Sequence, residues 1–62
     1  MWFKKVTNDR WVSVCGNYSV ERLREPTPEG MFQASRIDWN HYLGTGTKDG
    51  MMKLCSEHDL TN

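Results

Sequence analysis

The chain has 62 residues, enough for one small domain that buries only about 60% of the surface its unfolded form exposes. Eight basic and eight acidic side chains cancel, which argues against a strongly basic nucleic-acid binder and against a highly acidic nucleic-acid mimic. Three Trp, two Tyr and two Phe supply apolar area for a core, so we expect one folded domain over residues 1–62.

The expected location is the cytoplasm. No apolar run approaches the roughly 20 residues of a membrane span, and residues 1–5 become polar too early for a signal peptide. The chain begins with Met and is expected to be a complete small protein. In that compartment Cys15 and Cys55 are expected to be free thiols, although a disulfide between them would fit a strand-to-helix topology.

Two segments, residues 11–14 and 18–21, alternate in polarity and predict a β-hairpin. A two-residue turn would pair Val12 with Glu21, whereas a three-residue loop would pair Val12 with Val20. The second register gives one clean apolar face, so we expect it. In this register the residues that face a covering helix are Val12, Val14, Tyr18 and Val20. The residues on the opposite face are Trp11, Ser13, Ser19 and Glu21.

The hairpin is flanked by less regular segments. Residues 1–9 read as an extended arm or an edge strand, and the sheet is expected within residues 10–45. A third strand over residues 31–37 follows a proline-containing loop. Residues 42–43 either extend that strand past a bulge or form a short extra strand, and Gly44-Thr45-Gly46 ends it. In the third strand, Phe32 and Ala34 are expected to face the core, and Gln33 and Ser35 are expected to face outward.

The chain closes with a helix expected over residues 47–58. Thr47 is a good N-cap, and apolar residues follow it at helical spacing. This stripe comprises Met51, Leu54, Cys55 and His58. Packed on the apolar strand face, it completes an α+β fold: a three-stranded antiparallel sheet with one C-terminal helix across one face, in the order β-β-β-α.

One set of residues could bind zinc. Cys55 and His58 lie one helical turn apart, and Cys15 and His41 could complete a Cys2His2 set. The competing interpretation is a core cysteine in an apolar stripe, since cysteine is among the most buried residue types. We favour that interpretation and expect neither a metal nor another cofactor.

Signs of catalysis are weak. Neither histidine belongs to a recognisable nucleophile motif, and no paired carboxylates stand out, so we expect no enzyme activity. Gly44 and Gly46 precede the helix, but the βαβ context of a phosphate-binding loop is missing. We interpret them as a strand-to-helix turn.

The sheet face opposite the helix is the expected contact surface. In the favoured register Trp11 points away from the helix, and exposed Trp residues are frequent hot spots of protein interfaces. The alternative is that the N-terminal segment covers Trp11 through Trp2 or Phe3. The residues expected to contact a partner protein are Trp11, Glu21, Gln33 and Trp39.

Two resemblances bear on function. The run Arg10–Val14, the strand 31–37 and Tyr42-Leu43-Gly44-Thr45 before a helix resemble the pattern of the plant ethylene-response DNA-binding domain and of the arm-binding domain of phage integrases. That resemblance implies DNA binding by Arg and Trp on the exposed sheet face. The whole chain is also similar in size and pattern to small uncharacterised phage and prophage proteins, many of which dock on a host protein and block it.

The function we expect is a stand-alone protein-binding module that acts on a host protein, in the host cytoplasm if a phage encodes it. The first alternative is a small DNA-binding accessory protein that uses Arg10, Arg22, Arg24 and Arg36. The second is a zinc-stabilised mini-domain. An exposed strand edge and a small core also leave a homodimer open.

Overall fold

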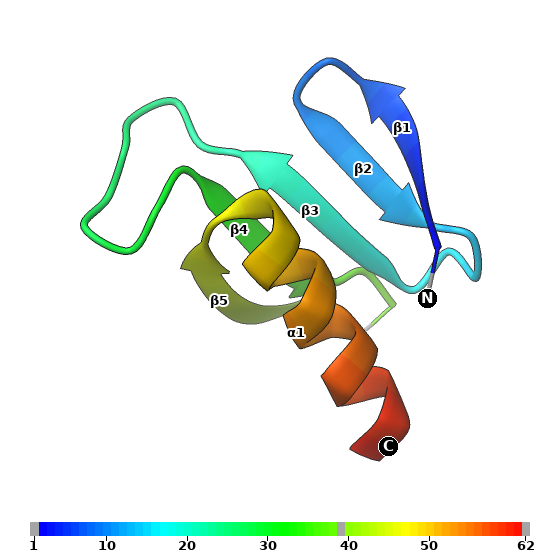
Figure 1. Cartoon of the computed structure of the whole chain (residues 1–62). Coiled ribbons are helices and arrows are strands. Elements are labelled where there is room, and N and C mark those ends of the chain that lie inside the picture. Colours follow the sequence, from blue (N-terminus) through cyan, green and yellow to red (C-terminus); the bar gives the residue numbers. More distant parts are fainter. Residues whose placement is uncertain (1, 39, 62) are drawn as a thin grey trace.

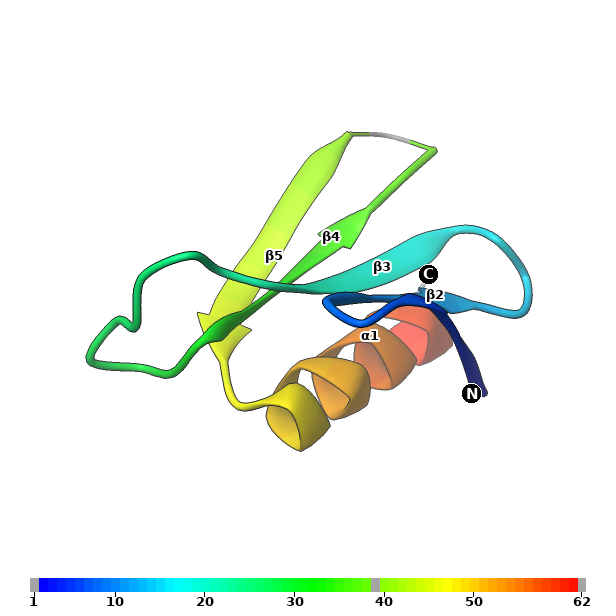
Figure 2. The same cartoon turned by 90° about the horizontal axis from the view of Figure 1, so that it is seen from above.

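The computed structural model describes residues 2–38 and 40–61 of the chain. They form a five-stranded antiparallel sheet with one helix laid across one face (Figures 1 and 2). The strands are β1 (Phe3–Thr7), β2 (Arg10–Ser13), β3 (Tyr18–Arg22), β4 (Phe32–Arg36) and β5 (His41–Gly46), and the helix is α1 (Lys48–Thr61). Strand order in space equals strand order in the sequence, so each strand pairs with its neighbours along the chain.

The expectation of a three-stranded sheet is wrong, because β1 and β5 add an edge strand on each side. At β1, the Asp9 amide donates to Thr7 Oγ1 over 3.2 Å and helps to close the turn to β2. At β5, Gly44 and Gly46 lie inside the strand and let α1 approach. A Cβ on Gly44 would lie 3.0 Å from Leu54 Cδ2, and a Cβ on Gly46 would lie 2.9 Å from Met51 Cε. The glycines that suggested a strand end are therefore needed for helix packing.

The hairpin register differs by one residue from the expected one. Trp11 pairs with Val20, and Val12 pairs with Ser19, across a loop over residues 14–17. Two hydrogen bonds hold this loop: the Tyr18 amide donates to Ser13 Oγ over 3.0 Å, and the Gly16 amide donates to the Ser13 carbonyl over 2.8 Å. Because a one-residue shift exchanges the two faces of a strand, it moves Trp11 to the helix side and Val12 to the bare side.

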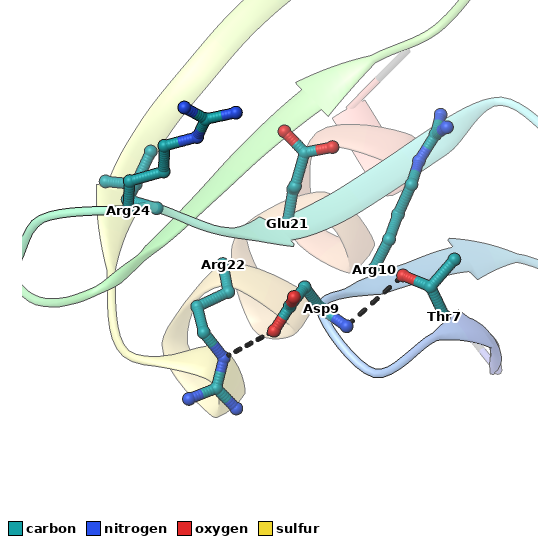
Figure 3. A pocket seen from close by; sticks show the side chains of 7 residues that line it. Thr7, Asp9, Arg10, Glu21, Arg22 and Arg24 are labelled. Carbon is teal, nitrogen blue, oxygen red and sulfur yellow. Dashed lines mark hydrogen bonds and ion pairs between the residues drawn. The ribbon is translucent and has the colours of Figure 1, made fainter.

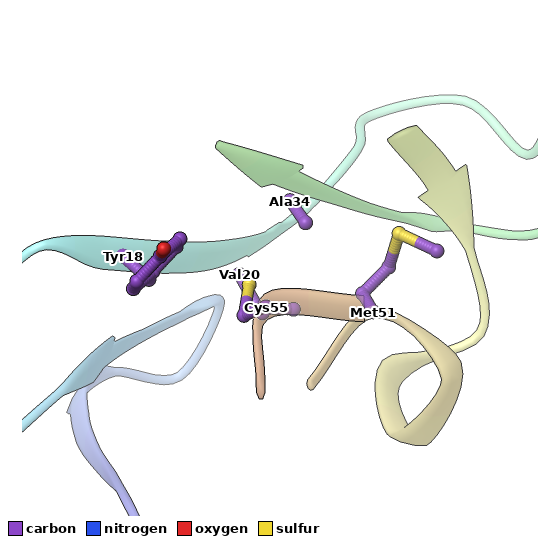
Figure 4. Close-up of a cluster of buried hydrophobic side chains, with 5 residues drawn as sticks. All are labelled: Tyr18, Val20, Ala34, Met51 and Cys55. Atoms are coloured by element: carbon purple, nitrogen blue, oxygen red, sulfur yellow. The ribbon is translucent and has the colours of Figure 1, made fainter. Parts of the chain in front are cut away.

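The core lies between the helix and the centre of the sheet (Figure 4). Its buried members are Tyr18, Val20, Ala34, Met51 and Cys55, and its half-buried members are Phe3, Phe32, Leu43, Met52 and Leu54. The inward placement expected for Tyr18, Val20, Phe32 and Ala34 is thus confirmed. The inward placement of Val14 is wrong, because its side chain is 70% exposed in the loop after β2.

Helix α1 begins where the sequence indicates and runs on to Thr61. Thr47 Oγ1 accepts a hydrogen bond from the Gly50 amide over 3.0 Å, which is N-cap geometry. A Cβ on Gly50 would lie 2.8 Å from that oxygen, so the glycine leaves room for the cap. Within the described residues, no helix combines the length and the hydropathy needed to span a membrane.

Candidate functional site

Trp11 is not on the bare sheet face. Its half-buried ring meets the Phe32 ring edge-on, with centroids 5.8 Å apart. Lys48 Nζ lies 4.9 Å from the Trp11 ring centroid and Lys5 Nζ lies 5.9 Å from it, both within reach of cation–π attraction. The side chain expected to anchor a partner is therefore engaged with the helix side of its own domain.

The other expected contact residues do not join Trp11. Glu21 and Gln33 pair across β3 and β4 on the bare face, where Glu21 is exposed and Gln33 is half-buried. Trp39 lies outside the described residues. The bare face is largely polar, and a hydrogen bond of 3.0 Å joins Ser19 Oγ to Ser35 Oγ at its centre.

A more apolar surface lies at the end of the domain where β1 begins and α1 ends. Trp2, Val14 and Leu60 are 81%, 70% and 85% exposed and line one groove of about 280 Å³. The remaining lining residues of this groove, called here the Trp2 groove, are Cys15, Ser56 and Asp59. The Val14 amide donates to the Trp2 carbonyl over 3.0 Å. This hydrogen bond holds the backbone of Trp2 against the loop after β2.

Sequence reasoning missed the Trp2 groove for identifiable reasons. The wrong register places Val14 in the core, and the helix expected over residues 47–58 stops short of Leu60, which leaves residues 59–62 as a mostly polar tail. The spacing of Ser56 and Leu60, four residues apart on α1, was the available signal that the tail continues a helical face. A large apolar residue in an otherwise polar tail was the second signal.

A second groove, of about 470 Å³, lies at the opposite end of β2 and β3 (Figure 3). Its lining residues, which define the arginine groove, are Thr7, Asp9, Arg10, Glu21, Arg22, Leu23 and Arg24. Arg22 Nε lies 3.2 Å from Asp9 Oδ1. The Arg10 Nε is shielded from solvent and has no hydrogen-bond partner among the residues the structure describes. Figure 3 shows Arg10, Glu21 and Arg24 extending to one side of the ribbon.

Three of the four arginines expected for DNA binding therefore line one groove, and the fourth does not. Arg36 lies on the helix side and binds Asp38 through two hydrogen bonds of 2.8 and 3.2 Å. The hydrogen bond to Asp38 is also the main reason that the pKa of Arg36 is raised. Arg36 is thus fixed within the domain.

Tyr18 is the centre of a polar cluster at the edge of the core. Arg36 Nη1 donates to Tyr18 Oη over 3.2 Å, and Tyr18 Oη lies 2.8 Å from His58 Nδ1. Because a guanidinium only donates, the Tyr18 hydroxyl accepts from Arg36, and the same oxygen shares a second hydrogen bond with His58. Burial raises the pKa of Tyr18, and the side chain is fully buried. This cluster fastens α1 to the sheet, and its hydroxyl is out of reach of a substrate.

The four residues considered for zinc are not gathered as ligands of one ion. The His41 and His58 rings lie 6.5 Å apart, Cys55 is buried in the core, and Cys15 lines the Trp2 groove. Across residues 2–38 and 40–61, no three His, Cys, Asp or Glu side chains are arranged to hold a metal. Burial also raises the pKa of the Cys55 thiol to about 11, which disfavours the thiolate that zinc requires.

Comparison of the chain with protein-family models, with curated proteins and with solved structures gives no match in any of the three. The resemblances to DNA-binding domains and to small phage proteins therefore stay predictions from the sequence.

Proposed function

We propose that the protein is a small binding module that docks a partner protein at the Trp2 groove. The observation that carries this proposal is the exposure of Trp2, Val14 and Leu60 around one hollow. Contiguous exposed apolar side chains of this kind mark interaction surfaces in soluble proteins, and Trp is enriched among interface hot spots. The resemblance to phage products that dock on host proteins makes a host protein the first class of partner to test.

The size of the groove favours a side chain of a partner over a small-molecule ligand. Pockets for small molecules usually measure about 300–1,000 Å³ and enclose most of the ligand. The Trp2 groove measures about 280 Å³ and lies at the surface between a loop and a helix end. It suits one bulky apolar side chain presented by another protein.

The test compares two variants that remove equal numbers of exposed apolar side chains. Trp2→Ser with Leu60→Ser disrupts the groove, whereas Val6→Ser with Ile37→Ser removes exposed apolar residues elsewhere. In affinity capture from the host lysate followed by mass spectrometry, the wild-type chain and the Val6/Ile37 variant should retain a protein that the Trp2/Leu60 variant loses. If all three retain the same proteins, the groove is not the docking surface.

A second candidate function, nucleic-acid binding, is favoured by the arginine groove. Arg10, Arg22 and Arg24 all line it, and Arg10 and Arg24 extend to the same side of the ribbon. Its affinity for an oligonucleotide should fall steeply with salt. Arg24→Gln should weaken binding more than Lys53→Gln, which removes one charge from the exposed side of α1. Absence of binding at low salt would eliminate this candidate.

A further inference from the structure

One wall of the Trp2 groove carries an exposed negative charge, the carboxylate of Asp59. Asp59 is exposed, lines the groove from the last turn of α1 and forms no direct ion pair with any residue that the structure describes, although its charge acts on Arg36 from a longer distance. Ion pairs do form elsewhere in the domain, at Arg22 with Asp9 and at Arg36 with Asp38. The rim charge is therefore available to a partner.

The position of Asp59 on the helix makes this charge more significant. The C-terminal end of a helix bears unpaired carbonyl groups and a partial negative charge, so cations are favoured there and carboxylates are not. The basic residue of the last turn is His58, and its Nδ1 is hydrogen-bonded to the hydroxyl of Tyr18. The helix end and Asp59 together make this wall of the groove electronegative, while Trp2, Val14 and Leu60 make the rest apolar.

From these observations we infer that the partner segment accepted by the Trp2 groove is both apolar and cationic, with a bulky apolar side chain beside Lys or Arg. This inference rests on the proposed docking function and names the chemistry of the docked segment. The apolar side chain enters the hollow, and the cation meets Asp59 and the terminal carbonyls of α1. Removing either half of the segment removes part of the complementarity.

The same charges argue against a second copy of the chain as the occupant. A two-fold contact brings identical surfaces together. If each copy inserted its Trp2 into the groove of the other, the two Asp59 carboxylates and the two helix C-termini would approach each other. Like charges placed together across an interface are unfavourable.

The experiment uses three short acetylated and amidated peptides and an isotope-labelled protein observed by NMR. Each peptide carries a Trp-Leu pair followed by two Arg, two Gln or two Glu. Binding is followed at the Trp2 indole N–H and at the backbone amides of Val14 and Leu60. Exposed ion pairs and helix-end interactions are each modest, so the Arg peptide should bind about fivefold tighter than the Gln peptide. The Glu peptide should bind most weakly.

Two charge variants of α1 assign the effect to Asp59. Asp59→Asn should bring the ratio of Arg-peptide to Gln-peptide affinity close to one. Glu57→Gln is the matched control, because Glu57 is an exposed carboxylate on the same helix that does not line the groove. It should keep most of the ratio, and equal loss of the ratio in both variants would overturn the role of Asp59.

The outcomes separate the inference from the proposed function. Equal binding of all three peptides at these resonances overturns the inference and leaves the docking function standing. No shift at these resonances with any peptide at millimolar concentration overturns both. Sedimentation velocity at the same protein concentrations tests whether a second copy of the chain fills the groove. A dimer that Trp2→Ser abolishes would assign the groove to that second copy and overturn the inference.

Discussion

The hydroxyl of Tyr18 lies 2.8 Å from Nδ1 of His58, and this contact joins the first residue of β3 to the last turns of α1. The two residues are 40 positions apart in the sequence, so the bond ties the C-terminal part of the helix to the middle of the sheet. Arg36 reaches the same hydroxyl from β4. One oxygen therefore links three elements.

Tyr18→Phe should lower the free energy of unfolding by about 1–2 kcal/mol, because Arg36 and His58 each lose a hydrogen-bond partner at the edge of the core. Urea denaturation measures the change. The control is Tyr42→Phe, which removes an exposed hydroxyl bonded to Thr45 Oγ1 and should cost less than about 0.5 kcal/mol. Equal losses in the two variants would contradict a structural role for the Tyr18 cluster.

The hairpin register can be tested by stability. Trp11→Ala should destabilise the domain by about 2 kcal/mol, since the ring packs on Phe32 and under Lys48. Val12→Ala should cost less than about 1 kcal/mol, because Val12 lies on the bare face. In the register expected from the sequence the order of the two losses would be reversed, so thermal or urea unfolding of this pair decides between the registers.

Gly30 should be the glycine least tolerant of substitution in the loops. Gly16 and Gly30 both have positive φ, at 81° and 148°, so alanine is strained at both positions. A Cβ on Gly30 would also lie 2.3 Å from the carbonyl carbon of Gly46, whereas a Cβ on Gly16 would meet nothing within 4 Å. Gly30→Ala should therefore cost about 2 kcal/mol more than Gly16→Ala in denaturant unfolding. Comparable losses would mean that the contact between the 23–31 loop and β5 is not tight.

Stability should fall in alkaline solution because of Cys55. Below pH 9 the thiol is protonated in both the folded and the unfolded states, so its contribution is fully present. Burial raises the pKa of the Cys55 thiol from 9.0 to about 11 in the folded state. Between these values the unfolded chain releases a proton that the folded chain retains, and the free energy of unfolding should drop by about 2 kcal/mol.

Unfolding measured at pH 8 and at pH 11 checks this dependence, with Cys55→Ala expected to lose much of the drop. Cys15→Ser serves as the control, because Cys15 is exposed, and it should keep the drop. Tyr18, whose pKa burial also raises, adds a further loss above pH 10 in every variant. An unchanged drop in Cys55→Ala would assign the effect to Tyr18 alone.

Local patterns predicted the centre of this fold well. The spacing of Met51, Leu54 and Cys55 indicated the helix face, and alternation in residues 32–36 indicated which side of β4 is buried. These signals are strong because the buried side of each element is apolar and the period is regular.

The parts that the sequence did not predict depend on single polar contacts or on close approach. Ser13 is buried on the helix side because its hydroxyl accepts the Tyr18 amide, a bond that a hydrophobic pattern does not reveal. Gly44 stands in β5 because Leu54 needs the space. The Trp2 groove could not be predicted from the sequence for two reasons. The hairpin register decides where Val14 lies, and the length of α1 decides where Leu60 lies.

The packing of α1 has a consequence for motion in this domain. The helix rests mainly on β3, β4 and β5, so the β1–β2 hairpin is held largely by its pairing with β3. Segments with fewer tertiary contacts open locally at lower free energy than the rest of a protein. The amides of β1 and β2 should therefore exchange with deuterium sooner than those of β3 and β4. Because the Trp2 groove spans this hairpin and the helix end, a docked segment would slow that exchange.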